Sequence, residues 1–338
     1  MVDNRDQSKP LNQIGEKLFL SMISHFVDTP VLDFNDDASA IPINDTDVLV
    51  INADMLVKQT DVLPGMSPLQ IGRKVVSMSI SDIVAKGVLP MGFLASIAFP
   101  ATTEFNFAYD VIHGIKLQCN DYNIPFLGGD LNEGNDVIVD GISFGIVNRD
   151  MLLSRKGLEH GDLLYVTGLF GYTSLAFKML LDGLHVPEPL KSSILLKVYE
   201  PKAQFHFLPL LRSGFVKTCI DSSDGLFSTL KDLAKANGLG ISLSNIPISE
   251  DVLHYSEKFD LNPVDLALFG GEEYELVLGV KKSLQHQFES ASLQFGLKVH
   301  LIGSLTKFDD SISISDSRFS NYNFPDDRIH GYDHFLFK

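Results

Sequence analysis

The stretch Asp47-Val-Leu-Val-Ile-Asn-Ala-Asp-Met-Leu-Val57 decides how the first half of the chain folds. Its alternating apolar positions and β-branched residues predict a half-buried strand. Two further segments, 92–99 and 137–147, share this pattern. The first half of the chain is therefore predicted to be rich in strands.

Helices are expected between these strands. Ser67 and Pro68 are typical of a helix N-cap and first turn, and we expect this helix to run to about Lys86 and to end at Gly87. Apolar residues spaced three and four apart over 105–119 predict a second, amphipathic helix.

Beyond about Arg149 the pattern changes to alternating strands and helices. The expected strands are 163–167, 218–220, 241–243 and 275–280, and the expected helical stretches are 172–181, 190–212 and 226–237. Because 338 residues exceed an ordinary single core, we predict two domains of an α/β (α+β) fold. These are a strand-rich N-terminal domain, 1–150, and an α/β C-terminal domain, 151–338.

Composition excludes several classes of protein. Apolar residues make up 45% of the chain and charged residues 21%, which is typical of a protein that buries a core. The longest nearly uncharged apolar stretch, 91–103, is shorter than the ~20 residues of a membrane span, and residues 1–9 hold no apolar signal core. Cys119 and Cys219 are isolated, so they form no disulfide framework or cysteine metal cluster. We therefore expect a cytoplasmic protein with no membrane segment.

The net charge of −16 limits the ligands that the chain can bind. Such a charge repels nucleic acid, acidic membranes and free phosphates. A polyphosphate substrate would therefore need bridging cations, and the chain would need carboxylates to hold them. No G-x-x-x-x-G-K-[ST] loop and no strand-linked G-x-G-x-x-G is present, which disfavours a P-loop or a Rossmann phosphate site.

Aspartates in apolar or glycine-flanked settings are the strongest candidates for such a site, because hard cations such as Mg²⁺ prefer oxygen ligands. Asp54 carries the best argument, since it interrupts an apolar strand, where an unpaired carboxylate is costly. Other aspartates have competing structural roles. Asp36-Asp37 taken alone favours a surface turn, Asp82 could pair with Lys86 one helical turn on, and Asp130 could lie in a hairpin turn after Gly128-Gly129.

Two later segments are also candidates. In Cys219-Ile-Asp-Ser-Ser-Asp-Gly-Leu226, Ser223 or Asp224 could cap the following helix, and Asn237-Gly238 could end it. Capping and anion binding use the same free amide groups, so the two roles are compatible. Phe269-Gly-Gly-Glu-Glu-Tyr-Glu-Leu276 joins a glycine pair to three acids before a strand, for which we favour a functional role.

Together, these motifs resemble thiamine-monophosphate kinases, of the superfamily that also contains aminoimidazole ribonucleotide synthetase and selenophosphate synthetase. The resemblance spans nearly the whole chain. Its motifs are Asn35-Asp-Asp-Ala, Asn52-Ala-Asp-Met-Leu-Val, Ser79-Ile-Ser-Asp-Ile-Val-Ala-Lys-Gly, Gly128-Gly-Asp, Ile220-Asp-Ser-Ser-Asp-Gly-Leu, Gly270-Gly-Glu-Glu-Tyr-Glu-Leu and Gly331-Tyr-Asp-His-Phe. The segments 60–67 and 85–90 look like the archaeal branch.

The resemblance implies Mg²⁺ as cofactor, ATP and thiamine monophosphate as ligands, and a homodimer formed through the N-terminal halves. The implied Mg²⁺ ligands are Asp37, Asp54, Asp82, Asp130, Asp221 and Asp224. The implied ATP contacts are Gly129, Arg155 and Ser223, and the implied substrate positions are Asp61, Glu272 and Ile329. Asp61 stands where bacterial members commonly place a histidine, and Ile329 where they place an aromatic residue. The substrate pocket therefore departs more from the family pattern than the metal site does.

The function that the resemblance implies is direct in-line transfer of the ATP γ-phosphoryl group to thiamine monophosphate, giving thiamine diphosphate. Phosphoryl transfer requires positioning and charge neutralisation, which metal ions held by aspartates supply. Two alternatives remain open. One is a related ATP-dependent enzyme acting on another small substrate, and the other is a non-catalytic nucleotide- or thiamine-binding protein.

Overall fold

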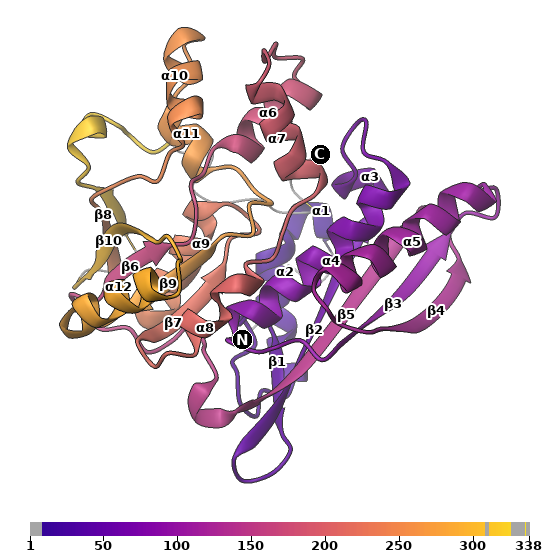
Figure 1. The fold of residues 1–338 in the computed structure, drawn as a ribbon, viewed down its shortest axis with the longest axis horizontal. Helices are drawn as coiled ribbons and strands as arrows, with labels where there is room; N and C mark the ends of the chain where they lie inside the picture. Colours follow the sequence, from indigo (N-terminus) through magenta and orange to yellow (C-terminus); the bar gives the residue numbers. More distant parts are fainter. Residues whose placement is uncertain (1–8, 308–310, 326–334, 336–338) are drawn as a thin grey trace.

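Two β-sheets organise the chain in the computed structural model, which describes residues 9–307, 311–325 and 335 (Figure 1). The first sheet has the order β1-β2-β5-β3-β4. Its strands are β1 (Ser39–Pro42), β2 (Asp47–Val57), β3 (Gly92–Phe99), β4 (Phe126–Glu133) and β5 (Ile138–Asn148). The second sheet has the order β11-β8-β10-β6-β9-β7. Its strands are β6 (Leu163–Val166), β7 (Val216–Asp221), β8 (Gly240–Leu243), β9 (Leu276–Val280), β10 (His300–Thr306) and β11 (Ile312–Ile314).

The helices fall into two groups along the chain. Those before β6 are α1 (Leu11–Ile14), α2 (Glu16–Ile23), α3 (Lys58–Asp61), α4 (Pro68–Ala85) and α5 (Phe105–Asp121). Those after it are α6 (Tyr172–Leu181), α7 (Leu190–Tyr199), α8 (Leu208–Leu211), α9 (Leu226–Asn237), α10 (Glu250–Lys258), α11 (Pro263–Leu268) and α12 (Gln285–Gln294). Within the described ranges, no helix combines the length and the apolarity that crossing a bilayer requires.

The mixed α/β class expected from the sequence is confirmed, and the strongest local patterns became the expected elements. β2, β3 and β5 occupy the three predicted stretches, and α4 begins with a capping box formed by Ser67 and Gln70. All strands up to β5 lie in the first sheet and all strands from β6 in the second. The domain limits 1–150 and 151–338 stay a prediction.

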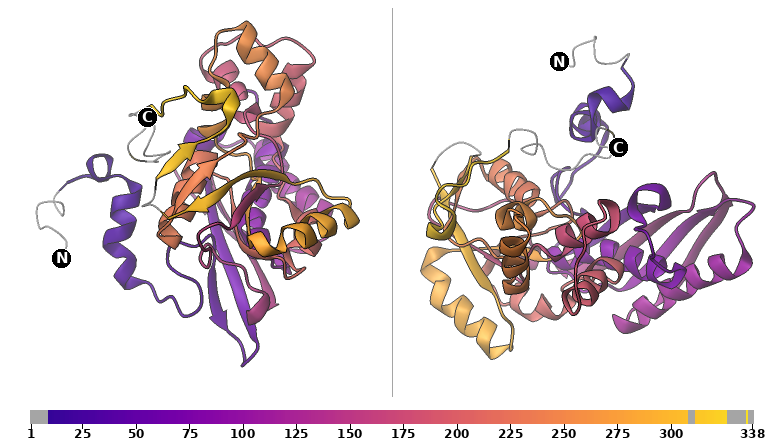
Figure 2. Two further views of the ribbon diagram at one scale, coloured as in Figure 1. Left: turned by 90° about the vertical axis from the view of Figure 1, so that its left-hand side faces the viewer. Right: turned by 90° about the horizontal axis from the view of Figure 1, so that it is seen from above.

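The hairpin turn considered for Asp130 is wrong. Gly128 (φ 99°) and Gly129 (φ 151°) adopt backbone conformations that favour glycine, yet they lie inside β4, which pairs in parallel with β3. β4 is an edge strand and Asp130 is exposed on it. The sequence pattern also missed β1 and the N-terminal helices α1 and α2, which contain no buried residues and project from the body of the molecule (Figure 2).

Helix α4 connects the two sheets. It packs on β2 and β5 of the first sheet and contacts β7 of the second, and most of its residues are buried. One buried apolar cluster accordingly includes Leu56 and Ile80 together with Tyr165 and Leu278. Side chains of α4 therefore lie between the halves, where both halves can contribute to one site.

Candidate active site

One face of α4 carries the side chains around which the site is built. Lys74, Met78, Asp82 and Lys86 follow one another at four-residue intervals, which places them along one side of the helix. Met78 and Asp82 line a cavity of about 970 Å³. This cavity lies between α4, the C-terminal end of β2, the segment 221–228 after β7, and the loop 268–274 before β9. Both halves of the chain thus contribute to its wall.

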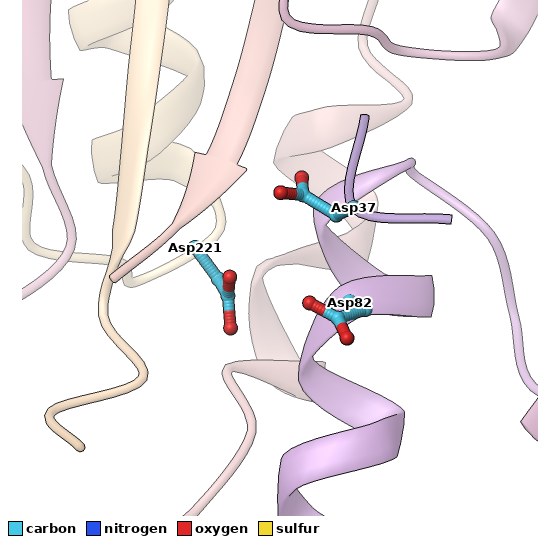
Figure 3. Close-up of side chains that lie close together, drawn as sticks. All are labelled: Asp37, Asp82 and Asp221. Atoms are coloured by element: carbon cyan, nitrogen blue, oxygen red, sulfur yellow. The ribbon is translucent and has the colours of Figure 1, made fainter. Parts of the chain in front are cut away.

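Three carboxylates converge at one end of this face (Figure 3). Oxygen atoms of Asp37, Asp82 and Asp221 all lie within 4.8 Å of one another. Asp37 comes from the loop before β1, Asp82 from α4 and Asp221 from the end of β7. Burial, and then Asp37, raises the pKa of Asp221 to about 7. Burial, followed by Asp221 and Asp54, raises the pKa of Asp82 well above its ordinary value.

Neighbouring polar groups hold the carboxylates of Asp82 and Asp221 in place. Asn52 Nδ2 donates to Asp82 Oδ2 at 2.6 Å and to the Asp37 carbonyl at 3.2 Å. Ser81 Oγ donates to Asp221 Oδ2 at 2.6 Å. These hydrogen bonds fix the orientation of each carboxylate, but they do not neutralise the negative charge that the cluster concentrates.

Asp37 differs from its neighbours because cations surround it. Arg155 Nε donates to Asp37 Oδ1 at 3.0 Å, and Lys86 Nζ lies 2.6 Å from Oδ2. Burial alone would raise the pKa of Asp37, but Arg155 and Lys86 together hold it below its ordinary value. Lys86 also pairs with Asp36, and it is fully buried.

Two structural roles considered from the sequence are therefore wrong. The side chains of Asp36 and Asp37 are only 3% and 1% exposed, so they do not form a surface turn. Asp82 accepts from Asn52, while Lys86 is drawn to the Asp36-Asp37 pair and to the Cys219 carbonyl at 3.1 Å. Helical spacing allowed an Asp82–Lys86 pair, but Lys86 pairs instead with the two adjacent carboxylates of Asp36 and Asp37.

Asp54 lies on β2 at the wall of the cavity, as does Asp61 on α3. Burial, followed by the charges of Asp221 and Asp61, raises the pKa of Asp54 to about 7. Asp61 Oδ2 accepts from the Val57 amide at 2.6 Å, which holds the turn between β2 and α3. The strand aspartate that the sequence singled out thus faces the other acids of the site.

The segment between Asp221 and α9 approaches the loop before β9 very closely. A Cβ atom on Gly225 (φ 93°) would lie 1.8 Å from the Gly270 carbonyl oxygen, so only glycine fits there. The amide of Glu272 donates to the Ser223 carbonyl at 2.6 Å. Through these contacts, Ser223, Asp224 and Glu272 all reach the cavity wall.

The expected end of α9 is confirmed, whereas capping of its start by Ser223 or Asp224 stays a prediction. The N-cap of α9 is Gly225, with no side-chain cap, whereas Gly238 ends the helix in the left-handed conformation. Asn237 Nδ2 donates to the Arg155 carbonyl at 2.8 Å, so the end of α9 also anchors Arg155.

Two of the expected site residues do not join the carboxylate cluster, and a third lies outside the described residues. Gly129 and Asp130 are exposed on the edge strand β4, and neither lines the cavity. Ile329 lies outside the described residues, as does most of the segment 331–335. Whether these residues bind a metal, ATP or substrate stays a prediction.

Sequence reasoning missed four residues of the site: Asn52, Lys74, Ser81 and Lys86. Lys74, Asp82 and Lys86 lie on one helical face, and this spacing was a visible signal in the sequence. Charged side chains on the buried face of a helix need charged or polar partners, which are often part of a site. Nothing in the sequence pointed to Asn52 and Ser81, which act only through contacts across the fold.

The carboxylate cluster fits a hard divalent cation. Its three carboxylates, of which that of Asp221 belongs to a buried residue and the other two to partly buried residues, supply the oxygen atoms that Mg²⁺ prefers. The raised pKa values of Asp54 and Asp221 are the cost of holding these acids together without a cation. Bound cations would remove that cost.

Both the sequence and the fold of this chain are similar to those of known proteins. Residues 35–147 match the family described as AIR synthase related protein, N-terminal domain. A thiamine-monophosphate kinase of Pyrococcus horikoshii is 35% identical over 249 residues, covering 73% of this chain and 77% of the relative. One of Methanocaldococcus jannaschii is 32% identical, covering 75% and 81% respectively. A solved structure described as AaThiL complexed with AMPPCP and TMP has a TM-score of 0.83 at 24% identity, covering 97% of this chain and 99% of that one.

Proposed function

The chain belongs to the thiamine-monophosphate kinase family, and we propose that it transfers the γ-phosphoryl group of ATP directly to its acceptor with Mg²⁺ held by its aspartates. The chain is an ATP-dependent phosphotransferase that converts thiamine monophosphate to thiamine diphosphate. The carboxylate cluster of Asp37, Asp82 and Asp221 is the observation that carries the proposal, because a phosphate cannot approach it unless cations intervene.

The proposed Mg²⁺ ligands are the three members of this cluster and three further aspartates. They are Asp37, Asp54, Asp82, Asp130, Asp221 and Asp224. These carboxylates would hold Mg²⁺, which would neutralise the charge of the phosphates. Asn52 and Ser81 support this role by orienting Asp82 and Asp221 before any ligand arrives. Preorganised ligands of this kind need little rearrangement during the reaction.

Gly129, Arg155 and Ser223 are the proposed ATP contacts. The guanidinium fork of Arg155 grips Asp37 through Nε and a terminal nitrogen, and the same fork fits a phosphate. Arg155 could therefore exchange the carboxylate of Asp37 for a phosphate of ATP. Ser223 lies on the cavity wall next to Asp224, at the start of the turn that leads to α9.

Asp61 and Glu272 are the proposed acceptor contacts, with Ile329 as a third position. Asp61 and Glu272 share the cavity with apolar side chains, among them Phe177, Leu181 and Phe269. Apolar walls with a few placed acids suit a flat heterocycle that carries positive charge and N–H donors. A thiazolium and an aminopyrimidine ring have these properties.

The described residues that line the cavity include no cysteine and no histidine, and the labelling experiment below tests whether its serines or aspartates accept a phosphoryl group. Cys119 and Cys219 are both buried, and burial raises the pKa of each thiol. The acceptor is itself a phosphate with negatively charged oxygens, so no side chain need remove a proton from it. The tasks left to the protein are positioning and charge neutralisation.

We also propose a cytoplasmic homodimer. One face of the first sheet is covered by α4 and α5, while apolar side chains on its other face are exposed, among them Ile51 and Ile146. An exposed apolar face of this kind is typical of a protein–protein interface. The free thiols of Cys119 and Cys219 agree with a reducing compartment.

A coupled assay of ADP release, run with and without thiamine monophosphate, tests the proposal. We expect Mg²⁺-dependent ADP release only when the acceptor is present, with thiamine diphosphate formed in equal amount. After incubation with γ-labelled ATP, the protein itself should carry no label. Stable labelling of the chain, or ADP release that ignores the acceptor, would contradict direct transfer.

A further inference from the structure

Lys74 is a fully buried lysine on the face of α4 that points toward the cavity. Its Nζ donates to the Asp61 carbonyl at 2.7 Å and pairs with Glu272 Oε1 at 2.5 Å. Asp61 ends α3, and Glu272, which is 198 residues from Lys74 in sequence, belongs to the loop before β9. A buried ammonium group needs such partners, so this lysine ties together two segments from opposite halves of the chain.

Glu272 is held in an unusual conformation. Its φ of 62° lies in the left-handed region, where non-glycine residues are uncommon and must be held by their surroundings. Its amide is bonded to the Ser223 carbonyl and its Oε1 to Lys74. Within the described part of the chain, Oε2 is buried and accepts no hydrogen bond. One carboxylate oxygen is therefore anchored, and the other remains to serve a ligand in the cavity that Glu272 lines.

The position of Lys74 along α4 separates it from the metal cluster. Asp82 lies eight residues further on, which is about 12 Å along a helix axis. Lys86, one more turn on, serves the Asp36-Asp37 pair at the other end of the face. Lys74 therefore acts on the end of the cavity bounded by Asp61 and Glu272. Glu272 contacts the proposed ATP residue Ser223 through its backbone amide, whereas Lys74 contacts Glu272 through its side chain.

We propose that Lys74 is a positioning residue for the acceptor. It turns Glu272 so that Oε2 faces the bound heterocycle, where it attracts positive charge or accepts an N–H, and it fixes the α3 turn beside it. The inference rests on the proposed function for the identity of the acceptor. Lys74 touches neither the transferred phosphoryl group nor the metal ligands, so its effect should be selective.

The test is Lys74→Met, which keeps the length and apolar volume of the side chain but removes the ammonium group. We expect the KM for thiamine monophosphate, and its Kd by calorimetry, to rise at least about tenfold, the usual scale for breaking a buried charge pair. The KM for ATP should stay within about twofold. Lys74→Arg should restore most of the acceptor affinity, because a guanidinium can donate to both partners.

Arg73→Met is the matched control, since the neighbouring arginine pairs outward with Asp121 at 2.7 Å. It should leave both KM values unchanged. Glu272→Gln breaks the pair from its more exposed end and should give the same selective loss. The double variant Lys74→Met/Glu272→Gln should bind the acceptor no worse than Lys74→Met alone, because Lys74 acts through Glu272.

Three results would overturn the inference: equal rises in both KM values, additive losses in the double variant, or acceptor binding unchanged by Glu272→Gln. The last result decides the matter even if Lys74→Met folds poorly, because Glu272→Gln keeps a polar side chain at the pair. If wild-type protein binds thiamine monophosphate without releasing ADP, the proposed function fails, while the binding measurements still test Lys74.

Discussion

At the scale of single residues, the site trades stability for ligand binding. Asp221 is buried and Asp54 partly buried among other acids, and desolvation and these charges raise the pKa of each to about 7. Hydrogen bonds from Asn52 to Asp82 and from Ser81 to Asp221 orient these carboxylates but leave the pKa of both raised. Replacing a residue that destabilises the free protein but binds a cation should therefore raise stability and lower activity.

Replacing Asp54 with Asn should therefore have two opposite effects. Turnover in excess Mg²⁺ should fall about 100-fold or more, as when one electrostatic contact to a transition state is removed. The melting temperature without metal should rise, because the amide removes a repelling charge. The ADP assay and a thermal melt measure both. Asp130→Asn should share only the loss of activity, and Asp121→Asn, at the surface, should change neither.

Arg155→Lys tests the guanidinium fork. Lysine keeps the charge but cannot make the paired contact, so we expect the KM for ATP to rise about tenfold while the KM for thiamine monophosphate holds. Steady-state kinetics with each substrate varied in turn gives both values. A rise in the KM for thiamine monophosphate alone would contradict the assignment of Arg155 to ATP.

At the scale of elements, the crossing of α4 and α5 sets the position of the functional face. A Cβ atom on Gly72 would lie 2.0 Å from the Val111 carbonyl oxygen, and one on Gly114 would lie 2.1 Å from that of Leu69. The two backbones therefore touch directly at this crossing. Because Lys74 and Asp82 are carried by α4, any shift of this helix moves both ends of the site.

Gly72→Ala should destabilise the protein by about 2 kcal/mol or more, since the added carbon forces two helix backbones apart. Without a clash, replacing a glycine inside a helix with alanine would stabilise the protein by roughly 0.5–1 kcal/mol, so a loss of stability identifies the clash. Urea unfolding followed by circular dichroism measures the change. Gly114→Ala should act similarly, and a stabilising effect at either position would refute the close contact.

At the scale of the whole molecule, the acids concentrated between the halves make stability depend on pH. For Asp54 and Asp221 the folded pKa is raised, so between pH 4 and 7 the folded state holds protons that the unfolded state has released. Stability should therefore fall as the pH rises through this window. Asp37, with its lowered pKa, works in the opposite sense, but only at lower pH.

Without divalent metal, we expect the melting temperature to drop by at least about 3 °C between pH 5 and pH 8. Mg²⁺ should raise it more at pH 8 than at pH 5, because the carboxylates must be ionised to bind the cation. Fluorescence-monitored melting in EDTA and in Mg²⁺ supplies the comparison. In Asp54→Asn the metal-free slope should be shallower, and an unchanged slope would count against the assignment.

The proposed dimer is tested on the exposed face of the first sheet. Ile51 on β2 and Ile146 on β5 point to this face and are 36% and 41% exposed. Ile51→Glu with Ile146→Glu should convert the dimer to a monomer, as measured by light scattering after gel filtration. Leu293→Glu, on α12 in the second half, should leave the mass unchanged.

The sequence by itself determined the elements whose signals are local. Period-two alternation marked β2, β3 and β5, and Ser67-Pro68 marked the start of α4, because strand burial and helix capping depend on near neighbours. The same reasoning identified Asp54, since a carboxylate inside an apolar strand is costly wherever the strand packs. For β4, the two glycines suggested a turn, because positive φ values are far commoner in turns than in an edge strand.

Only the tertiary structure decided which charges meet. Asp82 might equally have paired with Lys86, and Asp36-Asp37 might have faced solvent, until the packing of α4 against β7 buried them together. Lys74 finds Glu272 across 198 residues of sequence. The physical reason is that local patterns specify conformation, whereas electrostatic energy depends on distances in space and on burial, and both are fixed only when the two halves close around α4.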